Sequence, residues 1–334
     1  MKIINTLLAS LLAVITLSSL KSDNVITIFL IGDSTMANKD ISDGKLERGW
    51  GMMLQNCFSE DVRIDNHAVN GRSSKSFIDE GRWQKVVEKI RPGDYVFIQF
   101  GHNDEKPQPE RHTDPGSTFD DNLRKFVTET REKGGIPVLF NSVVRRNFYK
   151  KTPKNDDDEA LRNTTGAKTA EVKEEGDTLY DTHGDYIIAP RNVAEAEGVA
   201  FIDANKITHD LEQGLGREAS KKLHMWFLPG EVSSLPDGRQ DNTHYNIYGA
   251  TVVSRLLADA VAEQVPALKP YIRHYDAAVA SDGTGQYFDP QEAVDNAPAD
   301  KSVTILICDG EWTKPTVPAD KDIRFVMRSG AQWK

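Results

Sequence analysis

The sequence predicts an α/β protein built around a parallel β-sheet. Short apolar runs rich in β-branched and aromatic residues alternate along the chain with longer stretches of helical periodicity. In open sheets of this kind, ligands bind outside the carboxyl ends of the strands. The residues that directly follow each expected strand are therefore the candidates for function.

The expected elements can be placed in chain order. β-Branched and aromatic residues dominate the apolar runs, which predict strands at residues 25–31, 62–68, 95–100, 135–144 and 199–203. Apolar residues at helical spacing predict helices at residues 49–58, 74–90, 117–133, 186–197 and 246–265.

Composition and charge exclude several classes of protein. The 334 residues are 38% hydrophobic, which is enough for a sizeable core, and only residues 152–178 are locally too polar to fold. The formal net charge of −10 argues against a nucleic-acid-binding protein, whose phosphate contacts require a basic face. The sequence contains no Gly-rich phosphate loop and no Cys/His zinc spacing.

The N-terminus has the layout of a secretory signal. Met1-Lys2 precede an apolar run over residues 3–20, and Lys21 follows it. We expect residues 1–22 to direct export and to be removed, so that the protein is secreted, periplasmic or part of the cell envelope. Retention as a membrane anchor is the alternative, because the run borders on the length of a membrane span.

The two cysteines, Cys57 and Cys308, lie far apart in the sequence. An oxidising compartment would permit a disulfide bond between them, but we expect two separate buried thiols. Cys57 is also too far from the expected signal to carry a lipid anchor.

Polar or glycine-bearing loops follow the first three expected strands. They contain Ser34, then Asn70-Gly71-Arg72-Ser73, then Gly101-His102-Asn103-Asp104. Each has a structural explanation: a serine after a strand can cap a helix, Asn-Gly is a common turn pair, and an asparagine in a loop often bonds its own backbone. Asp241 and His244 precede the last expected helix at a spacing that can bring carboxylate against imidazole, with a helix-capping cluster as an open alternative.

Together these residues supply each component of acyl transfer: a serine, an Asp-His pair, a backbone N–H donor at a glycine and an asparagine side-chain donor. The blocks GDST, NGRSS, GHND and DNTH resemble those of the GDSL or SGNH hydrolase superfamily. The blocks GDSTMA, RGWG, NGRSSKSF, QFGHND, DTHGDY and DNTHYN are similar to those of the rhamnogalacturonan acetylesterase family. The resemblance covers residues 25–265 and implies a flavodoxin-like, three-layer parallel sheet.

The resemblance also implies a role for each matched residue. Ser34 would be the nucleophile, His244 the general base and Asp241 the residue that orients the base. The backbone N–H groups of Ser34 and Gly71 and the side chain of Asn103 would form the oxyanion hole. A serine hydroxyl is a poor nucleophile until an imidazole accepts its proton, and the aspartate fixes the tautomer of that imidazole. Water then releases acetate from the acyl-enzyme, with no metal or organic cofactor required.

The residues after the fourth expected strand bear on the substrate. Arg145 and Arg146 would face the same sheet edge and could pair with galacturonate carboxylates, which arginine binds in a bidentate manner; two solvated surface arginines are the alternative. The segment that follows is longer than the family pattern, and its aspartate run indicates a solvated loop rather than a metal site.

The chain changes character after Pro266 and Pro270. The segment from residue 276 to residue 334 resembles the opening of a pectin methylesterase, whose parallel β-helix begins with a D-G-x-G-x-[YF] block and a QEAVDNAP helix. About 60 residues would form two or three coils at most, without the catalytic aspartates of later coils. We therefore expect a signal segment (1–22), an acetylesterase domain (23–270) and a truncated methylesterase-like segment (271–334) without methylesterase activity.

Three classes of function remain. The first is a serine esterase that removes O-acetyl groups from pectin, with rhamnogalacturonan as the expected substrate and another acetylated polysaccharide such as xylan as the alternative. The second is a lipase-like or thioesterase-like hydrolase, which should have a large apolar lid, whereas the candidate lid is charged. The third is a carbohydrate-binding protein without turnover, which the intact set of five residues disfavours. We expect an acetylated pectic polysaccharide or oligosaccharide as partner, and neither a nucleic acid nor a stable protein partner.

Overall fold

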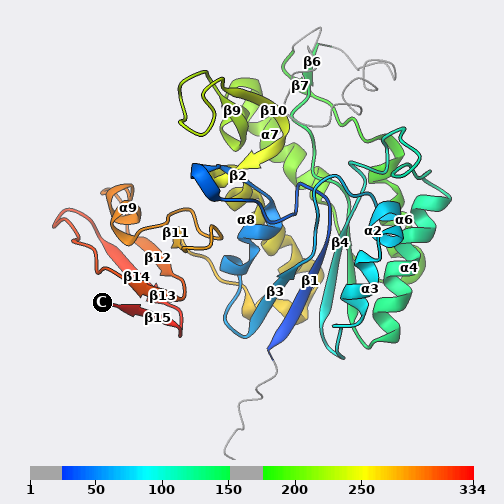
Figure 1. Cartoon of the computed structure of the whole chain (residues 1–334), viewed down its shortest axis with the longest axis horizontal. Helices are drawn as coiled ribbons and strands as arrows, with labels where there is room; N and C mark the ends of the chain where they lie inside the picture. The colour runs from blue at the N-terminus through cyan, green and yellow to red at the C-terminus, as the bar shows by residue number, and fades with distance from the viewer. Residues whose placement is uncertain (1–24, 151–175) are drawn as a thin grey trace, which may run out of the picture.

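The computed structural model describes residues 25–150 and 176–334 and is centred on a five-stranded parallel sheet (Figure 1). Its strands are β1 (Ile26–Gly32), β3 (Val62–Asn66), β4 (Tyr95–Gln99), β5 (Ile136–Phe140) and β8 (Ala200–Ile202). Their order in the sheet is β3-β1-β4-β5-β8. This order confirms the predicted flavodoxin-like α/β fold. The expected signal, residues 1–22, lies outside the described residues.

Helices cover both faces of the sheet and make it three-layered (Figure 1). Side chains alternate along β1, so Ile28 and Leu30 enter one hydrophobic cluster whereas Phe29 and Ile31 enter the other. The helices on the first cluster are α1 (Trp50–Met53), α7 (Ala204–Ala219) and α8 (Ile247–Gln264). Those on the second are α2 (Ser74–Asp79), α3 (Arg82–Val87), α4 (Thr118–Glu132) and α6 (Ala189–Glu197).

Several helices differ from the sequence-based expectation. The single helix expected at residues 74–90 is split into α2 and α3, because Gly81 between them has a left-handed conformation with φ 67°. The helix expected at 49–58 is the short α1 followed by a 3-10 helix, Leu54–Cys57. Another 3-10 helix, Gly184–Ile187, precedes α6. α7 is an additional helix, and the Asp203 side chain caps its first turn.

Two small sheets lie toward the carboxyl end of the parallel sheet (Figure 1). The three-stranded sheet consists of β2 (Glu47–Arg48), β10 (Arg239–Asn246) and β9 (His224–Phe227), paired antiparallel in that order. β6 (Phe148–Tyr149) pairs with β7 (Thr178–Leu179). The expected solvated loop, residues 152–178, falls mostly outside the described residues. Short 3-10 helices also form at Ser42–Gly44 and Ser220–Leu223, and a further one, Pro266–Tyr271, follows α8 and contacts the chain just before β3.

The C-terminal strands lie to one side of the main sheet (Figure 1). β11 (Ala277–Val279), β12 (Val303–Ile307) and β14 (Ile323–Met327) form one parallel sheet, and β13 (Gly310–Trp312) pairs in parallel with β15 (Ala331–Trp333). The short α9 (Pro290–Asp295) follows β11. These elements share a hydrophobic cluster of their own. Parallel strands stacked in this way have the arrangement of a short solenoid.

Polar contacts fix this C-terminal segment, residues 277–333, on the main domain. Arg48 Nε donates a hydrogen bond to the carbonyl of Gly283 (3.1 Å), and Asn56 Nδ2 donates to the carbonyl of Thr284 (2.7 Å). Gly283 has no room for a side chain, because its φ is +82° and a Cβ would lie 2.5 Å from Ile41 Cγ2. The segment is therefore docked in a defined position rather than loosely attached.

Both cysteines are free thiols close to this contact. Cys57 Sγ lies 3.6 Å from Ser254 Oγ, and Cys308 Sγ donates to Asn56 Oδ1 at 3.4 Å. Burial raises the pKa of each thiol to about 11, so both stay protonated near neutral pH.

Candidate active site

Ser34 lies in the tight turn that follows β1. The side chain of Asp33, not that of Ser34, makes the local bonds of this turn: Asp33 Oδ1 accepts from Thr35 N (2.9 Å) and Thr35 Oγ1 (2.8 Å). Gly32 is required before the turn, because a Cβ there would lie 2.7 Å from the carbonyl oxygen of Gln99 on the neighbouring strand. The turn is thus held by its neighbours, and the Ser34 hydroxyl is directed toward β10.

The Ser34 hydroxyl belongs to a three-residue chain of hydrogen bonds. Ser34 Oγ lies 2.9 Å from His244 Nε2, and His244 Nδ1 lies 2.8 Å from Asp241 Oδ2. The carboxylate fixes the tautomer with the proton on Nδ1, which leaves Nε2 to accept the serine proton. Burial alone would raise the pKa of Asp241, but His244 and Arg239 outweigh burial and hold that pKa well below its usual range. Asp241 is therefore a carboxylate at neutral and mildly acidic pH, where it can accept from His244 Nδ1.

The Asp-His pair lies near the end of strand β10, which leads directly into α8, so the pair precedes this helix as expected. Residues three apart on a regular strand point to opposite faces, but the pairing of β10 with β9 shifts register between Gln240 and Tyr245. Asp241 Oδ1 also accepts from the backbone N–H groups of Thr243 (2.8 Å) and His244 (3.0 Å). Asp241 thus forms a local turn with one oxygen and contacts the imidazole with the other, whereas α8 is capped by Asn246, whose side chain accepts from Gly249 N at 3.0 Å.

The two other candidate oxyanion donors lie next to each other. Gly71, in the loop after β3, has φ 73°, a conformation that favours glycine. Asn103, in the loop after β4, donates from Nδ2 to the carbonyl of Arg72 at 3.2 Å. An asparagine side chain has two N–H donors, and this bond uses one of them. The structure therefore brings the loops of Gly71 and Asn103 into contact at the same sheet edge as Ser34.

Asp104 connects the loop that contains Gly71 to the loop that contains Asn103. Its carboxylate accepts from the backbone N–H groups of Ser74 (3.0 Å) and Gly101 (3.1 Å) and from Thr113 Oγ1 (3.0 Å). Burial raises the pKa of Asp104 to about 7, although bonds from Ser74 and Thr113 act in the opposite direction. Asp104, the last residue of the GHND block, therefore fixes the position of its neighbour Asn103 through these hydrogen bonds.

A buried hydrogen-bond chain supports the serine turn from the opposite side. Trp50 Nε1 donates to Gln99 Oε1 (2.7 Å), and Gln99 Nε2 donates to Thr35 Oγ1 (2.8 Å), which in turn donates to Asp33. Because the indole can only donate, it fixes the orientation of the Gln99 amide and hence the direction of every bond in the chain. This gives Trp50 of RGWG and Gln99 of QFGHND a structural role that sequence reasoning did not assign.

Arg145 does not face the open edge of the sheet. Arg145 is 5% exposed, and its guanidinium pairs with the fully buried Glu105 side chain and donates to Thr182 Oγ1 at 3.2 Å. Burial would raise the pKa of Glu105, but Arg145 and His183 lower it to about 2. The role expected for Arg145 as a partner of a substrate carboxylate is therefore wrong for this structure, because a protein carboxylate occupies that position.

Arg146 is likewise not a solvated surface arginine, because it is buried among protein partners. It is 4% exposed, donates to Ser220 Oγ (2.9 Å) and Asn242 Oδ1 (3.0 Å), and lies 5.1 Å from the ring centroid of Trp226. Since Asn242 follows Asp241, this arginine supports the turn that carries the catalytic candidates. A double arginine after a buried strand gave no signal that distinguishes internal ion pairing from ligand binding.

A buried histidine pair lies beneath the GHND loop. The ring of His102 packs edge-on against that of His183, with centroids 4.4 Å apart. Both ring nitrogens of His102 are buried without a hydrogen-bond partner in the described part of the chain. Burial holds the pKa of His102 well below its usual value, so this imidazole is neutral.

Residues 25–150 and 176–334 contain no group of three or more His, Cys, Asp and Glu side chains arranged to hold a metal ion. Within the same two ranges, no helix has the length and apolar character needed to cross a membrane.

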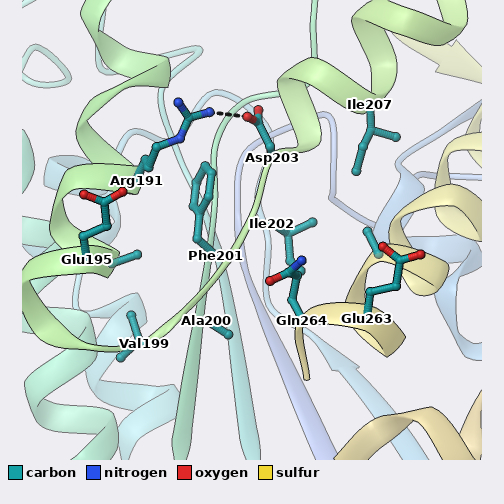
Figure 2. A pocket seen from close by; sticks show the side chains of 12 residues that line it. Arg191, Glu195, Val199, Ala200, Phe201, Ile202, Asp203, Ile207, Glu263 and Gln264 are labelled. Atoms are coloured by element: carbon teal, nitrogen blue, oxygen red, sulfur yellow. Dashed lines mark hydrogen bonds and ion pairs between the residues drawn. The ribbon is translucent and has the colours of Figure 1, made fainter. Parts of the chain in front are cut away.

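A groove of about 530 Å³ lies away from these residues, beside the edge strand β8 (Figure 2). It is lined by Val199–Asp203 and by side chains of α6, α7 and α8, and Arg191 pairs with Asp203 at its rim. None of the candidate catalytic residues contributes to its lining. The groove is therefore separate from the Ser34 site.

The flavodoxin-like fold and the Ser34–His244–Asp241 geometry define a serine hydrolase of the SGNH type. The model of the GDSL-like lipase/acylhydrolase family matches residues 30–250. The rhamnogalacturonan acetylesterase RhgT of Bacillus subtilis (strain 168) is 38% identical over 247 residues, which are 74% of this chain and 94% of that protein. The probable rhamnogalacturonan acetylesterase YesY of the same strain is 31% identical over 240 residues, 71% of this chain and 92% of that protein.

A crystal structure of protein YxiM from Bacillus subtilis shares the fold, with a TM-score of 0.54 and 22% identity over 73% of this chain and 58% of that chain. This chain belongs to the GDSL-like lipase/acylhydrolase family and is a carboxylic ester hydrolase. The family match ends at residue 250, before the C-terminal segment begins.

Proposed function

We propose that this enzyme removes O-acetyl groups from pectin and that rhamnogalacturonan is its polysaccharide. The observation that carries the proposal is the hydrogen-bond chain from Ser34 through His244 to Asp241. The identity of 38% with RhgT, named as a rhamnogalacturonan acetylesterase, supports the choice of substrate. An acetylated xylan is the second candidate within the same chemistry.

In the proposed mechanism, Ser34 Oγ attacks the acetyl carbonyl while His244 Nε2 takes the hydroxyl proton. Negative charge then develops on the carbonyl oxygen, which the N–H groups of Ser34 and Gly71 and the Asn103 amide stabilise. The sugar oxygen leaves with the proton held by His244. Water repeats the sequence on the acetyl-enzyme, releases acetate and restores Ser34, and no cofactor takes part.

The proposal is tested by measuring acetate release from acetylated rhamnogalacturonan and acetylated xylan, and nitrophenol release from a nitrophenyl octanoate ester. We expect the highest kcat/KM on rhamnogalacturonan, with a steep loss of activity on acyl groups longer than acetyl. Ser34→Ala is the matched control for each substrate. A preference for xylan would change the polysaccharide but keep the class of enzyme, whereas a preference for octanoate would favour a lipase-like hydrolase.

We also propose, from the sequence, that the chain is exported by residues 1–22 and acts outside the cytoplasm or in the cell envelope. The division at residues 270/271 is part of the same proposal, with a methylesterase-like C-terminal segment that lacks activity of its own. The separate hydrophobic cluster of residues 277–333 and their parallel strands support that division. Secretion by a host that expresses the full chain, with N-terminal sequencing of the product, tests the export signal.

A further inference from the structure

Asp241 has a cationic neighbour, Arg239, in addition to the imidazole of His244. Arg239 Nη2 donates to Asp241 Oδ2 at 2.5 Å, and the same oxygen accepts from His244 Nδ1 at 2.8 Å. The side chains of both residues are largely shielded from water: Asp241 is 5% exposed and Arg239 is 17% exposed. The guanidinium and the imidazole therefore share one carboxylate oxygen in a weakly screened environment.

Arg239 is itself held by an acidic residue. Its Nη1 donates to Glu47 Oε2 at 2.8 Å, and Glu47 Oε1 lies 2.8 Å from Lys39 Nζ. Lys39 also donates to Asn70 Oδ1 at 2.6 Å. We call Lys39, Glu47, Arg239 and Asp241 the charge ladder, because cations and anions alternate along it. The ladder runs from the imidazole to the residue that precedes Gly71.

Charged groups of other elements also face the Asp241–His244 pair. Asp33 after β1, Glu47 on β2 and His102 after β4 each interact electrostatically with His244. β9 contributes His224, whose Nε2 lies 2.9 Å from Glu212 of α7. Glu47 differs from the other groups, because it is hydrogen-bonded to Arg239 and Arg239 is hydrogen-bonded to Asp241.

We propose that Arg239 is a positioning residue that extends the activity of the Asp241–His244 pair to lower pH, and that Glu47 offsets part of its effect. The proposal rests on the proposed function, since it takes His244 as the general base. A cation beside the pair disfavours a further proton on it, and a carboxylate nearby favours that proton. Catalysis needs the unprotonated imidazole, so kcat/KM falls at low pH. The pH at which it falls, the acid limb of the profile, reports the opposing electrostatic effects of Arg239 and Glu47.

Arg239→Gln and Glu47→Gln test this balance, because they remove charges of opposite sign. Without Arg239 the pair binds a proton more readily, and the acid limb should move to higher pH by about one unit. Without Glu47 the proton is disfavoured, and the limb should move to lower pH. Arg239→Lys keeps the charge and should keep the limb near its wild-type position, while losing activity through the altered geometry.

Acetate release by the full chain is measured across the acid and neutral pH range for the wild type and these variants, with thermal melting of each. Arg63→Gln is the matched control: it removes one positive charge from a side chain that is 65% exposed on β3. This control should leave the limb unchanged. Opposite shifts for Arg239→Gln and Glu47→Gln support the proposal.

Shifts in the same direction, or lower kcat with an unmoved limb in both variants, would overturn it and leave Arg239 a purely structural residue. If Arg239→Gln does not fold, the profile of Glu47→Gln decides, because an unmoved or upward-shifted limb in that variant contradicts the proposal. Failure of the proposed function would give a different result. The wild type would then release no more acetate than Ser34→Ala does.

Discussion

Ser34 Oγ and His244 Nε2 lie 2.9 Å apart although 210 residues separate them in the sequence. Ser34 follows a strand of the main parallel sheet, whereas His244 lies on β10 of the small antiparallel sheet. The contact therefore exists only when the two sheets have been brought together by the rest of the fold. Both side chains are partly exposed at the sheet edge, so replacing them removes chemistry rather than core packing.

Ser34→Ala and His244→Ala should each lower kcat/KM on an acetyl ester by roughly 10³-fold or more, because each removes a group that bonds to the reacting atoms. The melting temperature should stay within a few degrees of the wild type. Esterase kinetics and thermal melting on the same preparations check both statements. Full activity in a folded Ser34→Ala protein would show that another residue is the nucleophile.

Asn103→Ala should reduce kcat by roughly 10²- to 10³-fold with little change in KM, because the side-chain donor matters chiefly once negative charge develops on the carbonyl oxygen. The variant also loses the 3.2 Å bond to the carbonyl of Arg72. Thermal melting separates these effects: a large loss of stability would assign the defect to the loop, and an equal rise in KM would make Asn103 a ligand of the ground-state substrate.

Glu105→Gln should remove one component of the acid sensitivity of the fold. The pKa of Glu105 is about 2 in the folded protein because Arg145 and His183 outweigh the effect of burial. A carboxyl whose folded pKa is depressed contributes stability above its unfolded pKa of about 4.5, and that contribution is lost as pH falls through the folded pKa. The contribution near neutral pH is about 3 kcal/mol.

The measurement for Glu105 is the free energy of unfolding between about pH 2 and pH 5 in the wild type and in Glu105→Gln. The wild type should lose stability across this window, while the variant should start less stable and vary less. Glu110→Gln is a suitable control, because the Glu110 side chain is 67% exposed. Equal pH slopes in Glu105→Gln and the wild type would exclude Glu105 as a source of acid sensitivity.

Deletion of residues 276–334 should leave kcat on a small acetyl ester within about threefold, since the candidate catalytic residues end at His244. Stability should fall, because the deletion leaves Arg48 without its bond to Gly283 and uncovers Ile41. Activity and thermal melting of the truncated and full chains test this. Loss of turnover in a truncated protein that still folds would assign the C-terminal segment a part in the active site.

The central sheet and the loops that follow its strands could be predicted because their signals are local. A run such as Val25 to Ile31 is apolar enough to specify a buried strand, and the loops that follow parallel strands must share one edge. The strand order that results brings the loops of Ser34, Gly71 and Asn103 together.

The remaining differences depend on tertiary contacts. β10, for example, forms a strand because β2 and β9 pair with it. The pairing of Arg145 with Glu105 joins residues 40 apart, which no spacing rule shows. A charged residue after a strand can serve a ligand or another side chain, and the sequence alone does not separate the two.

The placement of Ser34 after a strand of one sheet and of His244 on a strand of another has a consequence for inactivation by heat. A small displacement of β10 relative to β1 would break the 2.9 Å contact while each sheet kept its own hydrogen bonds. Local opening of this kind requires less free energy than global unfolding. On heating, the enzyme should consequently lose activity reversibly a few degrees below its cooperative melting transition.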